Sequence, residues 1–113
     1  MNLEIKIDIS DNVALVHITG EVDLYSSPAV RNELLNLTKK KVPIILILLK
    51  KVNYMDSSGV ATLIEGLQLT NKYQGRFALI GLNPNVREVF ELTRLDKIFD
   101  IYKDVDSALE ANT

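Results

Sequence analysis

The chain of 113 residues contains no cysteine and only one histidine, His17. Without cysteine it can form neither disulfides nor thiolate metal sites, and thiol catalysis and thiol redox chemistry are excluded. A single histidine, in an expected strand, is most often structural, and the acidic residues lack the spacing of a calcium loop. We therefore expect no bound metal and no cofactor.

Long apolar runs and a strong charge of either sign are also lacking. No stretch approaches the roughly 20 apolar residues that cross a bilayer, and residues 1–6 alternate in polarity, unlike a signal peptide. The net charge is −2, and basic residues cluster only at 39–41 and 50–51, where a helix and a strand are expected to end. The sequence predicts a cytoplasmic protein with no membrane insertion and no direct contact with nucleic acid.

The motifs of the common enzyme classes are missing as well. Ser57 is not framed by Gly-x-Ser-x-Gly, no phosphate loop ends in Gly-Lys-Ser/Thr, and no Gly-x-Gly-x-x-Gly is present. We predict no catalytic residues and no enzymatic activity, although a small enzyme or a nucleotide-binding protein remains an alternative.

What the chain does have is regular hydrophobic patterning. Leucine and isoleucine alternate with polar residues over 3–9, as in a half-buried strand, and Asp11-Asn12 can turn the chain into a second strand. The stretch 42–49 is apolar at nearly every position, which is typical of a central parallel strand covered on both faces. The expected strands are 3–9, 13–19, 42–49, 77–80 and 97–102, and the expected helices are 27–40, 57–73, one from Pro84, and 104–111.

This order, ββαβαβαβα, predicts an α/β fold: a single domain over residues 1–113 with a mostly parallel central sheet and one antiparallel N-terminal strand. The helix at 27–40 is expected to take Ser27 as N-cap, followed by Pro28. The loops after the parallel strands, 20–26, 53–59 and 81–85, should meet at one rim of the sheet. The rim should bring Asp23 and Ser57 close together.

Ser57 stands at the most informative point of the rim. It follows a buried strand and begins a helix, where free backbone N–H groups and the helix dipole can stabilise an added phosphate. The simpler interpretation of Asp56-Ser57-Ser58-Gly59 is a capped helix start with a glycine for tight packing. The tetrapeptide alone leaves both interpretations open.

The wider context favours the first. Three segments together resemble the STAS family, and within it the bacterial anti-sigma factor antagonists: 53–60, with Met55-Asp56-Ser57-Ser58-Gly59 as its most specific element, 20–23, and 89–99. The resemblance covers essentially the whole chain and implies a STAS-like domain. One departure is Gly59-Val60-Ala61, where many members have Gly-Leu-Gly.

The resemblance implies a regulatory function. An unphosphorylated antagonist binds an anti-sigma factor, which is also a serine kinase, and thereby frees a sigma factor. Phosphorylation, expected here on Ser57, releases the antagonist, and a serine phosphatase restores it. Further partner-binding residues are expected around the acceptor: Asp23, Asp56, Ser58 and Gly59. Tyr54, Met55 and Val60 are candidates for apolar contacts, because aromatic and methionine side chains are enriched at interfaces, but residues that enter a strand-to-helix turn can equally fill the core.

A phosphate would add about −1.5 to −2 charge next to acidic side chains, so a partner shaped for a neutral hydroxyl would be repelled.

The same residues also allow a second function. A STAS module can act as a regulatory subunit of a membrane transport system, with Ser57 serving only as part of a helix start.

Overall fold

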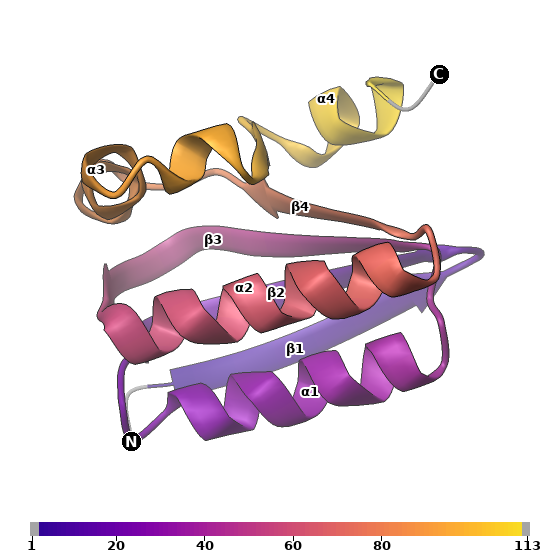
Figure 1. Ribbon diagram of the computed structural model, residues 1–113, viewed down its shortest axis with the longest axis horizontal. Coiled ribbons are helices and arrows are strands. Elements are labelled where there is room, and N and C mark those ends of the chain that lie inside the picture. The colour runs from indigo at the N-terminus through magenta and orange to yellow at the C-terminus, as the bar shows by residue number, and fades with distance from the viewer. Residues whose placement is uncertain (1–2, 112–113) are drawn as a thin grey trace.

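Residues 3–111, described by a computed structural model, form a five-stranded sheet with four α-helices (Figure 1). The strands stand in the order β1-β2-β3-β4-β5; β1 is antiparallel to β2, and all other neighbours are parallel. The expected fold class and element order are confirmed. The elements are β1 (Leu3–Ser10), β2 (Val13–Val22), α1 (Ser27–Lys39), β3 (Ile44–Met55), α2 (Ser57–Lys72), β4 (Arg76–Ile80), α3 (Pro84–Leu92), the 3-10 helix η1 (Leu95–Lys97), β5 (Asp100–Tyr102) and α4 (Val105–Glu110).

The sequential strand order decides where the helices lie. Right-handed crossovers that always step in the same direction across a sheet put every connecting helix on the same face. Figure 1 shows α1 and α2 side by side on this face, with α3 beyond them. The last helix, α4, follows β5 and packs on the opposite face.

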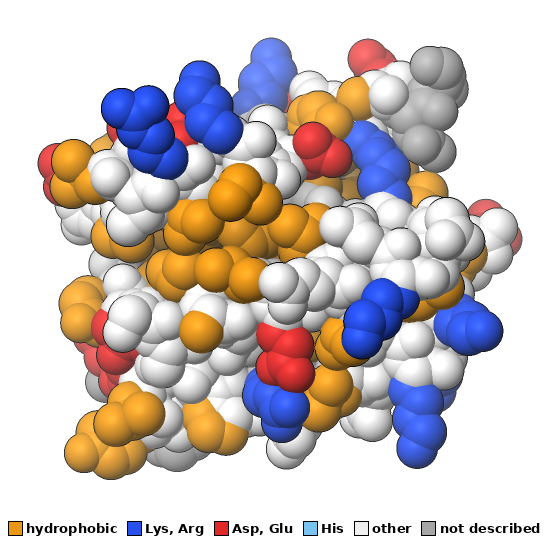
Figure 2. Space-filling model, in the orientation of Figure 1, with side chains coloured by type: hydrophobic (Ala, Val, Ile, Leu, Met, Phe, Trp, Pro, Cys, Tyr) orange, Lys and Arg blue, Asp and Glu red, His pale blue; other side chains and the backbone are white. Residues whose placement is uncertain are grey.

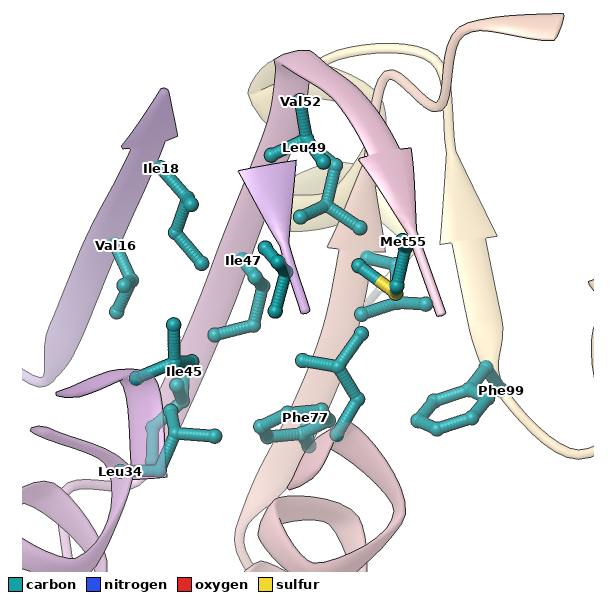
Figure 3. Packing of buried hydrophobic residues seen from close by; sticks show 14 of the residues in the cluster. Val16, Ile18, Leu34, Ile45, Ile47, Leu49, Val52, Met55, Phe77 and Phe99 are labelled. Atoms are coloured by element: carbon teal, nitrogen blue, oxygen red, sulfur yellow. The ribbon is translucent and has the colours of Figure 1, made fainter. Parts of the chain in front are cut away.

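The main core fills the space between the sheet and helices α1, α2 and α3 (Figure 3). Phe99, just before β5, closes one end of this core, with its ring 5.5 Å from that of Phe90 and 6.3 Å from that of Phe77. β3 contributes the most side chains because it is the central strand. The labelled core residues in Figure 3 include Val16, Ile18, Ile45, Ile47, Leu49, Val52, Met55 and Phe77.

The opposite face of the sheet is only partly covered. A small cluster under α4 contains Leu46, Ala78, Ile80 and Ala108. Beyond it the face is open, and half-exposed Leu48 lines a groove with charged side chains of β1, β2 and β3. The prediction that both faces of the central strand are covered is therefore wrong over this part of the sheet.

Two strands run further than their apolar residues suggest. β3 begins at Ile44 rather than at 42 and continues to Met55, and β2 continues to Val22, where 49 and 19 were the expected ends. The extensions pair with each other after two register shifts, at each of which β3 has one residue more than β2, and the buried side chains of Val52 and Met55 hold them to the core. The polar residues 50, 51 and 53 conceal this continuation in the sequence.

Two other local expectations also need correction. The N-cap of α1 is Ser26, so Ser27 is the first helical residue. The expected strand at 97–102 is shorter, because Arg94 adopts a left-handed conformation with φ 63° and the 3-10 helix η1 intervenes before β5. This turn directs Phe99 into the core and leaves Ile98 exposed.

Candidate functional site

Asp56 organises the rim at the start of α2. It is the N-cap residue, with extended backbone angles, and its Oδ1 accepts hydrogen bonds from the N–H groups of Ser58 at 2.9 Å and Gly59 at 3.3 Å. The Ser58 hydroxyl donates to the same oxygen at 2.6 Å. By accepting from these donors, Asp56 satisfies backbone N–H groups in the first turn of α2 that have no partner within the helix.

Asp56 also ties α2 to the loop that follows β2. Its second oxygen, Oδ2, accepts from the N–H of Leu24 at 3.2 Å, and its own N–H donates to the carbonyl of Val22 at 3.2 Å. The hydrogen bond from the Ser58 hydroxyl lowers the pKa of the Asp56 carboxyl, and those from the backbone N–H groups of Gly59, Ser58 and Leu24 act in the same direction against partial burial. A fixed negative charge therefore stands beside Ser57 at neutral pH.

The loop after β2 is built around Asp23. Its Oδ1 accepts from the N–H groups of Tyr25 and Ser26, both at 3.0 Å, which closes a tight turn. The Ser26 hydroxyl accepts from the Asp23 N–H at 2.9 Å and donates to the Glu21 carbonyl at 2.7 Å. Asp23 thus shapes its own loop, and the loop is fastened to α2 through Asp56.

The third segment joins the rim through Asn83, the N-cap of α3. Its Oδ1 accepts from the N–H of Val86 at 3.1 Å, and its Nδ2 donates to the carbonyl of Val52 in β3. The loops after β2, β3 and β4 are therefore fastened to one another or to a common strand. The prediction that the segments containing Asp23 and Ser57 meet at one rim is confirmed by the contact between Leu24 and Asp56.

Ser57 is the first residue of α2 and is exposed, whereas Ser58 is half-buried and bonded to Asp56. One part of the expected phosphate environment is wrong. The N–H groups of Ser58 and Gly59 are already donated to Asp56, so a phosphate on Ser57 would not find them free. The side chain that precedes Ser57 in the chain is the ionised Asp56 carboxylate.

The expected apolar contacts divide into two groups. Tyr54 is 50% exposed, whereas Met55 is 4% and Val60 9% exposed, and both belong to the main core. Met55 and Val60 thus cannot form an outer contact surface, and this expectation is corrected. The reason is that Met55 ends the β3 extension facing inward, and Val60 lies on the sheet-facing side of α2.

Two exposed apolar side chains near the site were not predicted from the sequence. Leu24 and Tyr25, in the loop after β2, are 65% and 84% exposed. Their signal in the sequence is a pair of apolar residues within a turn bounded by Asp23 and Ser26, where polar residues are the rule. We use the term rim surface for four exposed residues of the segments after β2 and around the end of β3: Leu24, Tyr25, Tyr54 and Ser57.

Gly59 lies buried under this rim. A Cβ atom at this position would stand 2.7 Å from Met55 Cγ and 2.8 Å from the Val22 carbonyl oxygen. Its role is therefore close packing of α2 against β2 and β3, rather than direct contact with a partner.

Apolar side chains also gather between α2 and α3 (Figure 2). Ile64 and Leu67 of α2 and Val89 of α3 are half-buried and pack against the main core from this side. Their exposed atoms mark the edge of the core where the two helices separate.

Comparison with known proteins identifies the family of this chain. The STAS domain profile matches residues 4–108. The chain belongs to the STAS domain family. It is 33% identical over 101 residues to the anti-sigma-B factor antagonist of Bacillus subtilis, covering 89% of this chain and 92% of that protein. It is 31% identical over 110 residues to the anti-sigma F factor antagonist of Paenibacillus polymyxa, covering 96% and 94%.

Solved structures agree. An anti-sigma factor antagonist from Mycobacterium paratuberculosis superimposes with a TM-score of 0.88 at 28% identity, over 96% of this chain and 92% of that one. The Bacillus cell fate determinant SpoIIAA shares the fold, with TM-scores of 0.76 for its phosphorylated and 0.83 for its unphosphorylated form, at 18% and 20% identity. The resemblance to anti-sigma factor antagonists predicted from the sequence is therefore confirmed.

Within residues 3–111, no helix is both long and apolar enough to span a membrane. In the same range, no three histidine or acidic side chains are grouped closely enough to hold a metal ion.

Proposed function

We propose that this STAS domain protein is an anti-sigma factor antagonist whose binding is controlled by phosphorylation of Ser57. In this proposal the unmodified chain docks its rim surface on an anti-sigma factor and thereby frees a sigma factor for transcription. The observation that carries the proposal is the exposed hydroxyl of Ser57 beside the ionised Asp56, on a chain whose relatives are anti-sigma factor antagonists.

The anti-sigma factor would itself be the kinase. The γ-phosphoryl group of ATP passes to Ser57 Oγ, the hydroxyl proton is lost and ADP leaves. A serine phosphatase hydrolyses the ester and returns the chain to its binding form. Exposure at the first position of α2 supports this assignment, because a kinase must reach the hydroxyl without unfolding the helix.

Electrostatics explain how one phosphate could switch the partner off. The added charge of about −1.5 to −2 would stand beside the Asp56 carboxylate, which its hydrogen bonds from Ser58 and Leu24 hold in place. A partner that accepts a neutral hydroxyl would then face repulsion and a desolvation cost. A penalty of about 3 kcal/mol lowers affinity roughly a hundredfold, with no change in fold.

In this proposal Tyr54, Leu24 and Tyr25 form the apolar part of the docking surface. Exposed aromatic side chains are enriched at the centres of protein interfaces. Two of these residues lie in the loop that Asp56 fastens to α2, so a partner that touches Ser57 also meets them. Asp23 contributes by holding this loop in shape.

The test is binding and phosphorylation with the cognate anti-sigma factor. Ser57→Ala should bind but gain no phosphate by intact mass after incubation with ATP. Ser57→Asp should bind at least about tenfold more weakly by calorimetry, because one carboxylate brings part of the phosphate charge. Its far-ultraviolet circular dichroism should match that of the unmodified protein.

Ser58→Ala is the matched control, since it removes the neighbouring hydroxyl but leaves Ser57 in place. This variant should still take up one phosphate. Phosphate on Ser58 in the Ser57→Ala protein, or full-strength binding by Ser57→Asp, would contradict the proposal.

We assign no catalytic role to the chain itself and place its action in the cytoplasm, where sigma factors work. Anti-sigma factor antagonists among the relatives favour this function over a transport subunit. A sulfate transporter family protein from Wolinella succinogenes shares the fold with a TM-score of 0.75, but 14% identity carries no more than the fold.

A further inference from the structure

The outer edge of β1 is unpaired in the part of the chain that the structure describes. β1 stands at the end of the strand order, and its neighbour β2 occupies only one side. Its backbone N–H and C=O groups on the free side can pair with another strand. The strand has eight residues with no proline, so nothing in the backbone prevents such pairing.

The side chains of β1 leave apolar surface at this edge. Leu3, Ile5 and Ile7 point toward the main core but are only half-buried, and Ile9, next on the same face, is 53% exposed. The other face carries Glu4, Lys6 and Asp8. A strand that covers this edge must therefore offer apolar side chains on one face and complementary charges on the other.

A second copy of β1 meets both requirements. We propose that this protein forms a symmetric dimer in which two β1 strands pair antiparallel, with Ile7 of each copy opposite Ile7 of the other. The two sheets then become one continuous ten-stranded sheet, in which the core-covering helices of both copies lie on the same face.

The charges select this register. With a two-fold axis normal to the sheet, residues that face each other across the dimer must have their side chains on the same face of the sheet. This is possible only when the axis passes at a residue, which then faces its own copy, and not between two residues. An axis at Lys6 would put Lys6 opposite Lys6 and Glu4 opposite Asp8, and an axis at Asp8 would put Asp8 opposite itself. Like charges directly opposite each other destabilise a strand pair.

An axis at Ile7 gives the favourable arrangement. Lys6 faces Asp8 twice, Ile5 faces exposed Ile9 twice, and Ile7 faces itself. This register pairs residues 4–10 of both strands, which yields about six to eight backbone hydrogen bonds. An axis at Ile5 also avoids like charges but pairs only 3–7 within the strand and leaves Ile9 exposed.

Asp8 can accept Lys6 without losing its present partner. Its Oδ2 lies 3.4 Å from His17 Nε2, and the Asp8 side chain is 59% exposed, which leaves its carboxylate accessible from the edge. The dimer would also leave the proposed docking site free. Leu3 pairs with Gly20 near the rim, so antiparallel β1 strands direct the two rims to opposite ends.

Cysteine cross-linking tests the register, because the chain has no cysteine of its own. Facing residues of antiparallel strands have Cα atoms about 4.5–5.5 Å apart, within the range of a disulfide. With oxidised glutathione as oxidant, Ile7→Cys should give a covalent dimer on a non-reducing gel. Ile5→Cys and Ile9→Cys should each give no covalent dimer alone but should cross-link to each other when mixed.

Charge reversal provides a test that leaves the core face unchanged. Lys6→Glu should raise the dissociation constant of the dimer about tenfold in sedimentation velocity, and Lys6→Glu combined with Asp8→Lys should restore it. Circular dichroism checks that each variant is folded. A protein that stays monomeric at all concentrations, or Ile5→Cys that cross-links to itself as readily as Ile7→Cys, would overturn the proposal.

This inference is independent of the switch at Ser57. Ser57→Ala and Ser57→Asp should leave the dissociation constant of the dimer unchanged, because their side chains lie on α2 away from the β1 edge. Failure of either proposal therefore leaves the other standing.

Discussion

At the scale of single residues, one carboxylate performs several tasks. Asp56 caps α2 through Ser58 and Gly59, fastens the loop after β2 through Leu24, and places a negative charge beside Ser57. The cap can be predicted from the sequence, since aspartate before a helical repeat is a common N-cap. The bond to Leu24 cannot, because it joins residues 32 positions apart and depends on how β2 and β3 lie side by side.

Asp56→Asn should separate these tasks. The amide oxygen can still cap α2, but the amide N–H₂ in place of Oδ2 cannot accept from the Leu24 N–H. We expect the free energy of unfolding at neutral pH, measured with urea, to fall by about 1 kcal/mol. The same substitution at Asp104, the N-cap of α4, should cost less, because it bonds only within its own helix start.

The effect of Asp56→Asn should depend on pH. The folded-state pKa of Asp56 lies below the ordinary value of 3.8, so the charged carboxylate stabilises the fold above that pH. This contribution disappears as the pH falls through the folded-state pKa. The difference in stability between the unmodified protein and Asp56→Asn should therefore shrink in acid. A difference that stays constant between neutral and acid pH would contradict the assigned role of the charge.

At the scale of elements, α2 is placed by close contact with the strands beneath it. Helical spacing predicts its length well: the expected 57–73 compares with the observed Ser57–Lys72. The strand before it is predicted less well, because polar residues 50, 51 and 53 interrupt the apolar pattern of the extension of β3, which is held in place by pairing with β2. Such pairing between distant segments leaves no periodic signal in the sequence.

Gly59→Ala tests this close contact. Helix propensity alone favours alanine over glycine by about 1 kcal/mol. Packing opposes it, because the new Cβ would stand 2.8 Å from the Val22 backbone oxygen and 2.9 Å from Val22 Cγ1. We expect packing to dominate and the free energy of unfolding to fall by about 1–3 kcal/mol in urea denaturation.

Ser57→Ala serves as the control for α2, since Ser57 is exposed at the helix start. The free energy of unfolding of this variant should differ from that of the unmodified protein by less than about 0.5 kcal/mol. A Gly59→Ala protein more stable than the unmodified chain would show that α2 can move outward at little cost. In that case glycine is not needed for the packing of α2 against β2.

At the scale of the whole molecule, the sheet has one covered face and one largely open face. The sequence predicts the parallel strands and their helices, but not this asymmetry. An apolar run such as residues 44–49 is typical of a strand buried on both sides. Whether it is so buried depends on strand order, since sequential right-handed crossovers leave only α4 for the second face.

Two neighbouring leucines, Leu48 and Leu49, lie on opposite faces of the sheet, so the same substitution at each position compares the two faces. Leu49 is 0% exposed in the main core, so Leu49→Ala should lower the free energy of unfolding by about 2–5 kcal/mol. Leu48 is half-exposed on the open face, so Leu48→Ala should cost about 1 kcal/mol or less. Both follow from urea denaturation of variants confirmed as folded by circular dichroism. Equal losses at the two positions would mean that the open face is covered in solution, and the sheet would then be buried on both sides as its sequence suggests.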